Sequence, residues 1–69
     1  MFFPHDRHAE DWIRQAAARW TQEELDIIVA LAEALAEQQG RKKLSVPELQ
    51  RAELHYVHEG HRPHAHQAD

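Results

Sequence analysis

The sequence contains no cysteine, so neither a disulfide nor a thiolate-bound metal can hold the fold together. It has a single serine, Ser45, and a single threonine, Thr21, and each precedes a helical pattern at the position where a hydroxyl caps a helix. A hydroxyl or thiol nucleophile is therefore not expected. With only two glycines, the chain also has no glycine-rich loop for phosphate. These absences argue against an enzyme, and no cofactor is expected.

A long apolar run is also missing. The opening stretch, MFFPHDRHAEDW, has neither the basic start nor the apolar segment of a signal peptide. No stretch approaches the roughly 20 apolar residues that a membrane-spanning helix needs. We therefore expect a cytoplasmic protein that does not enter a membrane.

The chain is short and acidic. Its 69 residues make one small domain, and a chain of this size buries only about 60% of its unfolded surface. A partner chain or a metal is the usual source of additional stability. The net charge of −4, from 12 acidic and 8 basic residues, lowers the expectation of nucleic-acid binding, although a local basic patch can still bind phosphate.

The first of three predicted helices covers residues 7–19. From Ala9 to Trp20 the apolar residues are separated by steps of three and one, which places them on one face of a helix. Asp6 is placed to cap its N-terminus. This face is expected to pack into the core.

Two further helices, over residues 22–39 and 46–58, are predicted from repeated start signals. The motifs TQEE and SVPE, beginning at Thr21 and Ser45, both have the spacing of a capping box. Gly40 suits the left-handed position that ends a helix. The fold class is therefore all-α, a small bundle of three short helices. We expect one helical domain over residues 1–60 and a disordered, histidine-rich tail over residues 61–69.

The helix over residues 22–39 is apolar around most of its circumference. Such a helix is usually buried on several sides, and two short neighbours cover only part of it. A homodimer through this helix is the simplest explanation, while a monomer in which the two neighbours suffice is the alternative. The expected dimer interface consists of Leu25, Ile28, Leu31, Ala32 and Leu35.

Histidines recur at every third position from His55 onward. His55 and His58 lie one turn apart on a predicted helix and could share a zinc, nickel or copper ion. The alternative is a polar helix end and tail with no fixed site. Metal binding is therefore kept as a third hypothesis of function.

Three consecutive cations, Arg41, Lys42 and Lys43, follow the helix over residues 22–39. Cations are favoured at a helix C-terminus by the helix dipole, and this alone explains them. The alternative is a contact with phosphate, although the preceding helix has acids and no base on its surface. Aromatic and cationic side chains also dominate protein interfaces. The candidate partner contacts are Phe2, Phe3, Trp12, Arg41, Lys42, Lys43 and Tyr56.

The segment LAEALAEQQGRKKLSVPELQRA, Leu31–Ala52, resembles the end of a histone fold. There a long helix, an Arg-Lys loop and a short capped helix follow one another, and the resemblance implies a dimer that binds DNA through the loop. The helix over residues 22–39 is about three turns shorter than the histone helix. In general character the chain is also similar to small phage-encoded proteins that inhibit host regulators, including quorum-sensing anti-activators.

The leading hypothesis of function is a non-enzymatic interaction protein. It would bind another protein, such as a transcriptional regulator, and modulate it, with inhibition as the expected direction. The runner-up is a DNA-binding dimer that uses the loop from Arg41 to Lys43. The two differ in their salt dependence, which is steep for a protein that contacts phosphates.

Overall fold

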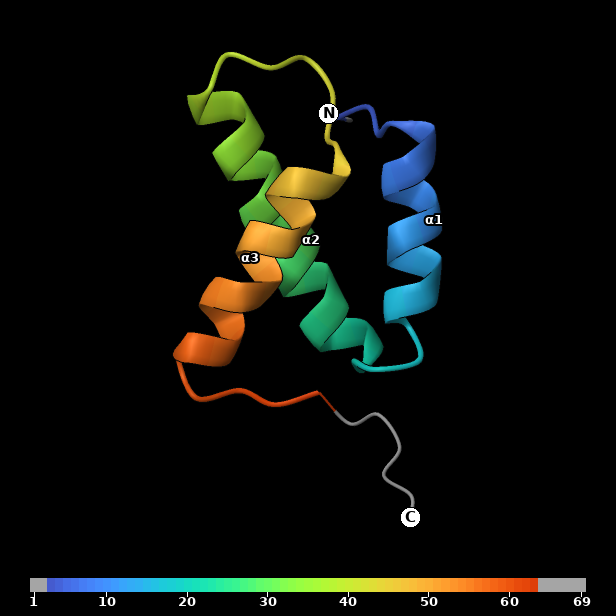
Figure 1. Cartoon of the computed structure of the whole chain (residues 1–69), viewed down its shortest axis with the longest axis vertical. Coiled ribbons are helices and arrows are strands. Elements are labelled where there is room, and N and C mark those ends of the chain that lie inside the picture. The colour runs from blue at the N-terminus through green and yellow to red at the C-terminus, as the bar shows by residue number, and fades with distance from the viewer. Residues whose placement is uncertain (1–2, 64–69) are drawn as a thin grey trace.

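Three α-helices make up the fold in the computed structural model, which describes residues 3–63. They are α1 (Arg7–Ala16), α2 (Gln22–Gln38) and α3 (Val46–His58), and the described part of the chain contains no strand. The predicted all-α class is confirmed. In Figure 1, α3 crosses α2, and α1 stands beside the pair. The packing of α2 against α3 is the most extensive in the molecule, and α1 contacts both helices more lightly.

Helix α1 begins as predicted but ends three residues earlier, at Ala16 rather than residue 19. Asp6 caps its start by accepting a hydrogen bond from the backbone N–H of Arg7 at 2.9 Å. Beyond Ala16 the backbone forms a tighter turn with hydrogen bonds between residues three positions apart. The N–H of Arg19 donates to the carbonyl of Ala16 at 2.8 Å. This tight turn delivers the next residue, Trp20, into the core, where it is 3% exposed.

Helix α2 begins at Gln22 as predicted and ends at Gln38, one residue before the predicted end. The Thr21 hydroxyl accepts the N–H of Glu24, and the Glu24 carboxylate accepts the N–H of Thr21, each at 3.2 Å. Gly40 has a φ of +75°, and its N–H donates to the carbonyl of Glu37 at 3.0 Å. The N–H of Arg41 donates to the carbonyl five residues back at 2.9 Å, which completes a Schellman motif.

Helix α3 runs from residue 46 to residue 58, as predicted, but the second capping box is incomplete. The Ser45 side chain accepts no backbone N–H. Its hydroxyl instead donates to the carboxylate of Glu48, which is 3% exposed. The prediction of a box equivalent to the first was therefore wrong. At the other end Gly60, with a φ of +105°, closes the helix in the same way as Gly40 closes α2.

A short parallel β-bridge joins the N-terminal segment to the loop between α2 and α3. The N–H of Asp6 donates to the carbonyl of Leu44 at 2.8 Å, and the N–H of Leu44 donates to the carbonyl of Pro4 at 3.0 Å. The Leu44 side chain is fully buried. The segment before α1 is thereby fixed across the end of the bundle, next to the loop (Figure 1).

The core lies between the three helices and corrects the expectation about the face of α2. Leu25, Ile28 and Ala32 are 3%, 0% and 0% exposed within the single chain, so they have no surface to offer a second copy. Leu31 and Leu35 are half-buried and pack against the same core. Buried alanines on all three helices let the helix backbones approach closely. This is why two short helices cover so much of the apolar surface of α2. The buried apolar residues are Ala9, Ala16, Trp20, Leu25, Ile28, Ala32, Ala36, Leu44, Leu49, Ala52 and Tyr56.

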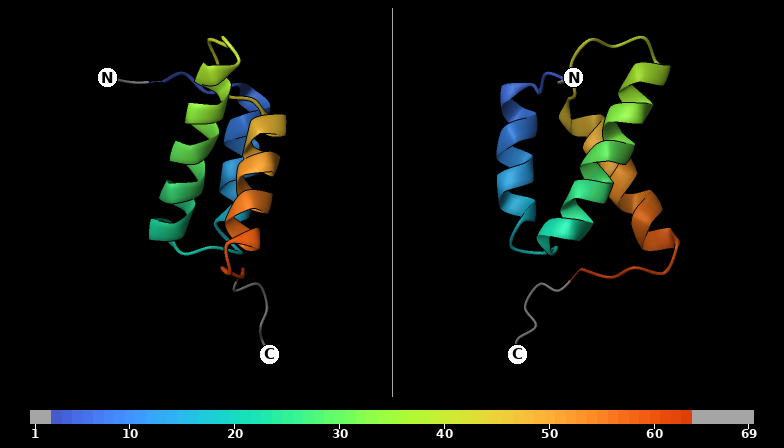
Figure 2. Two further views of the ribbon diagram at one scale, coloured as in Figure 1. Left: turned by 90° about the vertical axis from the view of Figure 1, so that its left-hand side faces the viewer. Right: turned by 180° about the vertical axis from the view of Figure 1, so that it is seen from behind.

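Among residues 3–63 three large apolar side chains remain exposed: Ile27 at 51%, Leu54 at 59% and Val57 at 39%. Figure 2 shows the bundle from two further sides, with the chain leaving α3 at its lower end. No helix in the described part is both long and apolar enough to cross a membrane. Of the predicted tail, residues 64–69 lie outside the described residues.

Candidate functional site: a groove between α1 and α2

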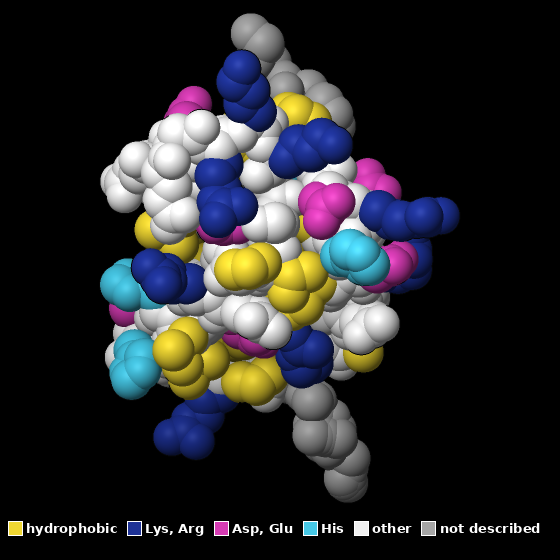
Figure 3. Space-filling model, turned by 45° about the horizontal axis from the view of Figure 1, so that its top comes forward, with side chains coloured by type: hydrophobic (Ala, Val, Ile, Leu, Met, Phe, Trp, Pro, Cys, Tyr) yellow, Lys and Arg dark blue, Asp and Glu magenta, His cyan; other side chains and the backbone are white. Residues whose placement is uncertain are grey.

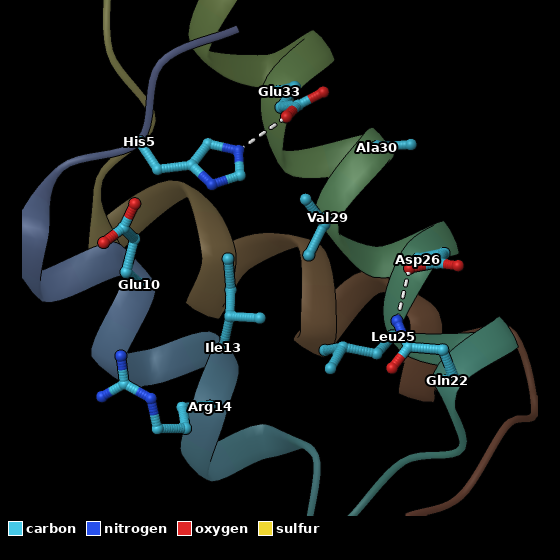
Figure 4. A pocket seen from close by; sticks show the side chains of 10 residues that line it. All are labelled: His5, Glu10, Ile13, Arg14, Gln22, Leu25, Asp26, Val29, Ala30 and Glu33. Carbon is cyan, nitrogen blue, oxygen red and sulfur yellow. Dashed lines mark hydrogen bonds and ion pairs between the residues drawn. The ribbon is translucent and has the colours of Figure 1, made fainter. Parts of the chain in front are cut away.

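An open groove of about 450 Å³ lies between α1 and α2. Ile13 of α1 and Leu25 and Val29 of α2 point toward one another across it and form an apolar floor (Figure 4). The groove exists because α1 contacts α2 less closely than α3 does. The remaining lining residues are His5, Glu10, Arg14, Gln22, Asp26, Ala30 and Glu33.

The groove follows one side of α2 for three turns. Its lining residues on α2 recur at alternating steps of three and one between Gln22 and Glu33, which keeps them on one face of the helix. This face adjoins the core face, so apolar side chains lie at the bottom and polar ones at the edge. Glu10 and Arg14 form the opposite edge on α1.

The edge of the groove carries more negative than positive charge. Of its three carboxylates, Glu33 is the only one that forms an ion pair within residues 3–63, with the Nε2 atom of His5 2.8 Å from its Oε2 atom. Asp26 accepts a hydrogen bond from the neutral amide of Gln22 at 2.8 Å, and Glu10 has no ion pair within residues 3–63. Arg14, the one arginine on the edge, pairs with a carboxylate on its own helix at 2.8 Å. The arrangement suits a ligand with an apolar face and positive charge beside it.

The structure separates the three predicted loop cations by role. Arg41 forms an ion pair with the buried carboxylate of Glu48, with 3.1 Å between Nε and Oε2, so it ties the end of α2 to the start of α3. Its Nε–H donates to the side-chain carbonyl of Gln39 at 3.3 Å. Lys42 and Lys43 are exposed and make no hydrogen bond or ion pair with the described part of the chain. Figure 3, which brings this end of the bundle forward, shows Lys and Arg side chains spread over the face among apolar and acidic ones. They do not form one continuous basic patch on that face.

The acidity of Glu48 reflects this local network. Burial by itself raises the pKa of the Glu48 carboxyl, but hydrogen bonds from the Ser45 hydroxyl and from the backbone of residues 45 and 48, together with the charge of Arg41, lower it below its ordinary value of 4.5. The group is therefore ionised at neutral pH. It serves the junction of α2 and α3, not the groove.

The predicted aromatic contacts are divided between core and surface. Tyr56 is only 6% exposed, because its ring stacks on His61 at 3.9 Å and meets Trp20 edge-on at 5.2 Å. Burial, followed by the charges of two nearby glutamates, raises the pKa of the Tyr56 hydroxyl. Trp12 and Phe3 are half-buried against the core, and Phe2 lies outside the described residues. Tyr56 therefore offers a partner little surface.

The predicted metal ligands do not form a cluster in the described part of the chain. His55 pairs with Glu59 one turn later, with 3.0 Å between Nε2 and Oε2, and His58 is exposed. Among residues 3–63 no group of three or more histidine and carboxylate side chains is placed to hold a metal. Within that range His55 and His58 therefore have no third ligand.

One partly buried polar network has no counterpart in the sequence-based predictions. The Oε2 atom of Glu53 accepts the indole N–H of Trp20 at 2.7 Å and the Nε–H of Arg19 at 3.1 Å. The guanidinium of Arg19 also lies 5.3 Å from the centre of the Trp12 ring. This network fixes the turn between α1 and α2 to α3.

Comparisons with protein-family models, with curated proteins and with solved structures found no match. The resemblances of Leu31–Ala52 to a histone fold and of the whole chain to phage-encoded inhibitors therefore stay predictions.

Proposed function

We propose that this protein is a non-enzymatic interaction protein that binds a segment of another protein in the groove between α1 and α2 and thereby modulates that protein. The observation that carries the proposal is a groove in which Ile13 and Val29 are only half-buried within the chain, bordered by carboxylates. Concave apolar surfaces with a few polar groups at the edge are the usual form of binding sites. The fold around the groove is built from capped helices and a closed core, so the site is largely pre-formed.

The acidic edge favours a basic target. Proteins that bind nucleic acid carry clustered lysine and arginine, and an acidic surface is complementary to them. A transcriptional regulator is therefore a suitable class of partner. Occupation of its basic surface would inhibit it by competition with DNA.

The proposal is tested by photo-crosslinking from the groove. A benzophenone amino acid replaces Ala30, which lines the groove and is exposed, and in a control protein it replaces Ala34, which is exposed on the same helix but outside the groove. Both proteins are irradiated in nuclease-treated lysate of the source cells. A protein adduct formed from position 30 and not from position 34 supports the proposal. Equal adducts from both positions, or none from position 30, would count against it.

A DNA-binding dimer remains the second candidate, because Lys42 and Lys43 are exposed and have no partner in the described part of the chain. Such a protein would lose affinity for duplex DNA steeply as salt increases. Light scattering at tens of micromolar tests the dimer separately. A monomer that does not shift duplex DNA at low salt would eliminate this candidate.

A further inference from the structure

We propose that the groove holds the apolar face of a short, positively charged amphipathic helix of the partner protein. This rests on the proposed function and adds the chemistry of the bound segment. The bound segment is a helix and not an extended strand or a small molecule. The residues on its flanks are lysine or arginine and not acidic. The shape and the charges of the groove each support one part of it.

The shape of the groove suits a helix. Its lining on α2 extends from Gln22 to Glu33, which corresponds to about 16 Å at 1.5 Å per residue. A partner helix of about 11 residues has the same length. Lying between α1 and α2, it would present apolar side chains at i, i+3, i+4 and i+7 to the floor formed by Ile13, Leu25 and Val29.

The charges suit a cationic helix. Glu10 and Asp26 stand on opposite edges, on α1 and α2, and neither has a cationic partner within residues 3–63. The only arginine on the edge, Arg14, is already paired with Asp11 at 2.8 Å. A helix with lysine or arginine on both flanks of its apolar face would place a cation near each free carboxylate. A helix with acidic flanks would be repelled on both sides.

A second copy of this chain is a poorer occupant. Its longest helix, α2, carries acids and no base on its exposed surface: Glu23, Glu24, Asp26, Glu33 and Glu37. Like charges across an interface oppose association. Ile28 and Ala32, two residues of the predicted dimer interface, are moreover fully buried within the single chain, so they are not available to a second copy.

The test measures binding of two matched peptides to the full chain. Both are blocked, fluorescein-labelled helices of about 12 residues with leucines at i, i+3, i+4 and i+7. One has lysines at the remaining positions and the other has glutamates. Fluorescence anisotropy at low salt should show binding of the lysine peptide only. Affinity should fall as salt increases, because the attraction is screened.

Variants of the protein locate the binding. Ala30→Arg adds bulk and positive charge at the groove and should lower the affinity for the lysine peptide by about tenfold or more. Ala34→Arg makes the same change outside the groove and should leave that affinity unchanged. Asp26→Asn removes one free carboxylate and should weaken binding about threefold to fivefold. Circular dichroism confirms that each variant is folded. Equal binding of both peptides, no binding of either, or equal effects of the two arginine variants would overturn the inference.

The two proposals fail in different ways. A crosslinked partner from position 30 without binding of the lysine peptide would leave the proposed function standing and overturn the cationic helix. Peptide binding without any crosslinked partner would uphold the chemistry of the groove and count against the proposed function. Failure of both experiments would remove the groove as a binding site. If the partner itself is identified, deletion of its basic amphipathic segment should abolish the adduct.

Discussion

Replacement of Glu48 by glutamine should destabilise the fold at neutral pH. The carboxylate is 3% exposed, accepts a hydrogen bond from the Ser45 hydroxyl and forms an ion pair with Arg41, whose Nε atom lies 3.1 Å away. Glutamine keeps the size of the side chain and one acceptor oxygen. It loses the negative charge and places an NH₂ group where an acceptor stood.

The size of the loss in stability follows from the interactions that Glu48 makes as a charged group. A hydrogen bond to a charged group contributes about 1.5–3 kcal/mol and a neutral one about 0.5–1.5 kcal/mol. Arg41 is 52% exposed, so its part is largely screened, and glutamine costs less to bury than a carboxylate. We therefore expect a loss of about 1–2 kcal/mol in the free energy of unfolding. For a domain of this size that lowers Tm by about 5–15 °C.

The pH dependence gives a second, independent readout. Because folding lowers the pKa of Glu48, its contribution to stability is fully present above the ordinary value of 4.5 and is lost as the pH falls through the lowered value. The difference in Tm between the wild type and Glu48→Gln should therefore be constant above about pH 6 and shrink as the solution becomes more acidic.

Differential scanning calorimetry between pH 7 and pH 3 measures both effects. Glu59→Gln is the matched control, because Glu59 is 56% exposed and pairs only with a histidine on the surface. Its Tm should stay within a few degrees of the wild type, since an exposed pair contributes about 0–1 kcal/mol. Unchanged stability of Glu48→Gln at pH 7, or a difference in Tm that does not depend on pH, would refute the reasoning.

Three further changes probe other parts of the fold. Glu53→Ala leaves the buried indole N–H of Trp20 without an acceptor and should lower the free energy of unfolding in urea by about 1–3 kcal/mol. A loss as small as that of a surface substitution would contradict the role given to Glu53. Gly40→Ala should cost about 1 kcal/mol through its backbone alone, because φ is +75° and a Cβ would meet nothing within 4 Å; a neutral result would mean that the Schellman turn relaxes freely. The double variant Lys42→Glu with Lys43→Glu should leave Tm and binding of the lysine peptide nearly unchanged. Loss of peptide binding in that variant would move the binding site from the groove to the loop.

The helix boundaries could be predicted because their signals are local. A capping box at Thr21 and a glycine at position 40 act through residues three to five positions away, and the structure shows the expected hydrogen bonds at both. The early end of α1 was not predicted. It depends on Trp20 and Arg19 reaching Glu53 on another helix, and that contact joins residues more than 30 positions apart.

The groove and the coverage of α2 could not be read from the sequence for a related reason. Counting apolar residues on the helix over residues 22–39 indicates how much surface needs cover, but it does not say how closely α1 and α3 approach. Ala9 and Ala52 allow that approach, and both are fully buried. The groove is what remains where α1 diverges from α2, so the helix angles decide its existence.

The β-bridge at Leu44 also constrains how the molecule is made. Pro4 and Asp6 find their hydrogen-bond partners only when Leu44 has been synthesised, a delay of about 2–8 s at ordinary rates of translation. Until then the segment before α1 lacks the partner that fixes it across the end of the bundle. Closing the chain between Pro4 and Leu44 also costs more entropy than closing the short loop between α2 and α3. Cleavage near residue 44 would therefore release this segment, including His5 at the edge of the groove, before it disturbed the helices themselves.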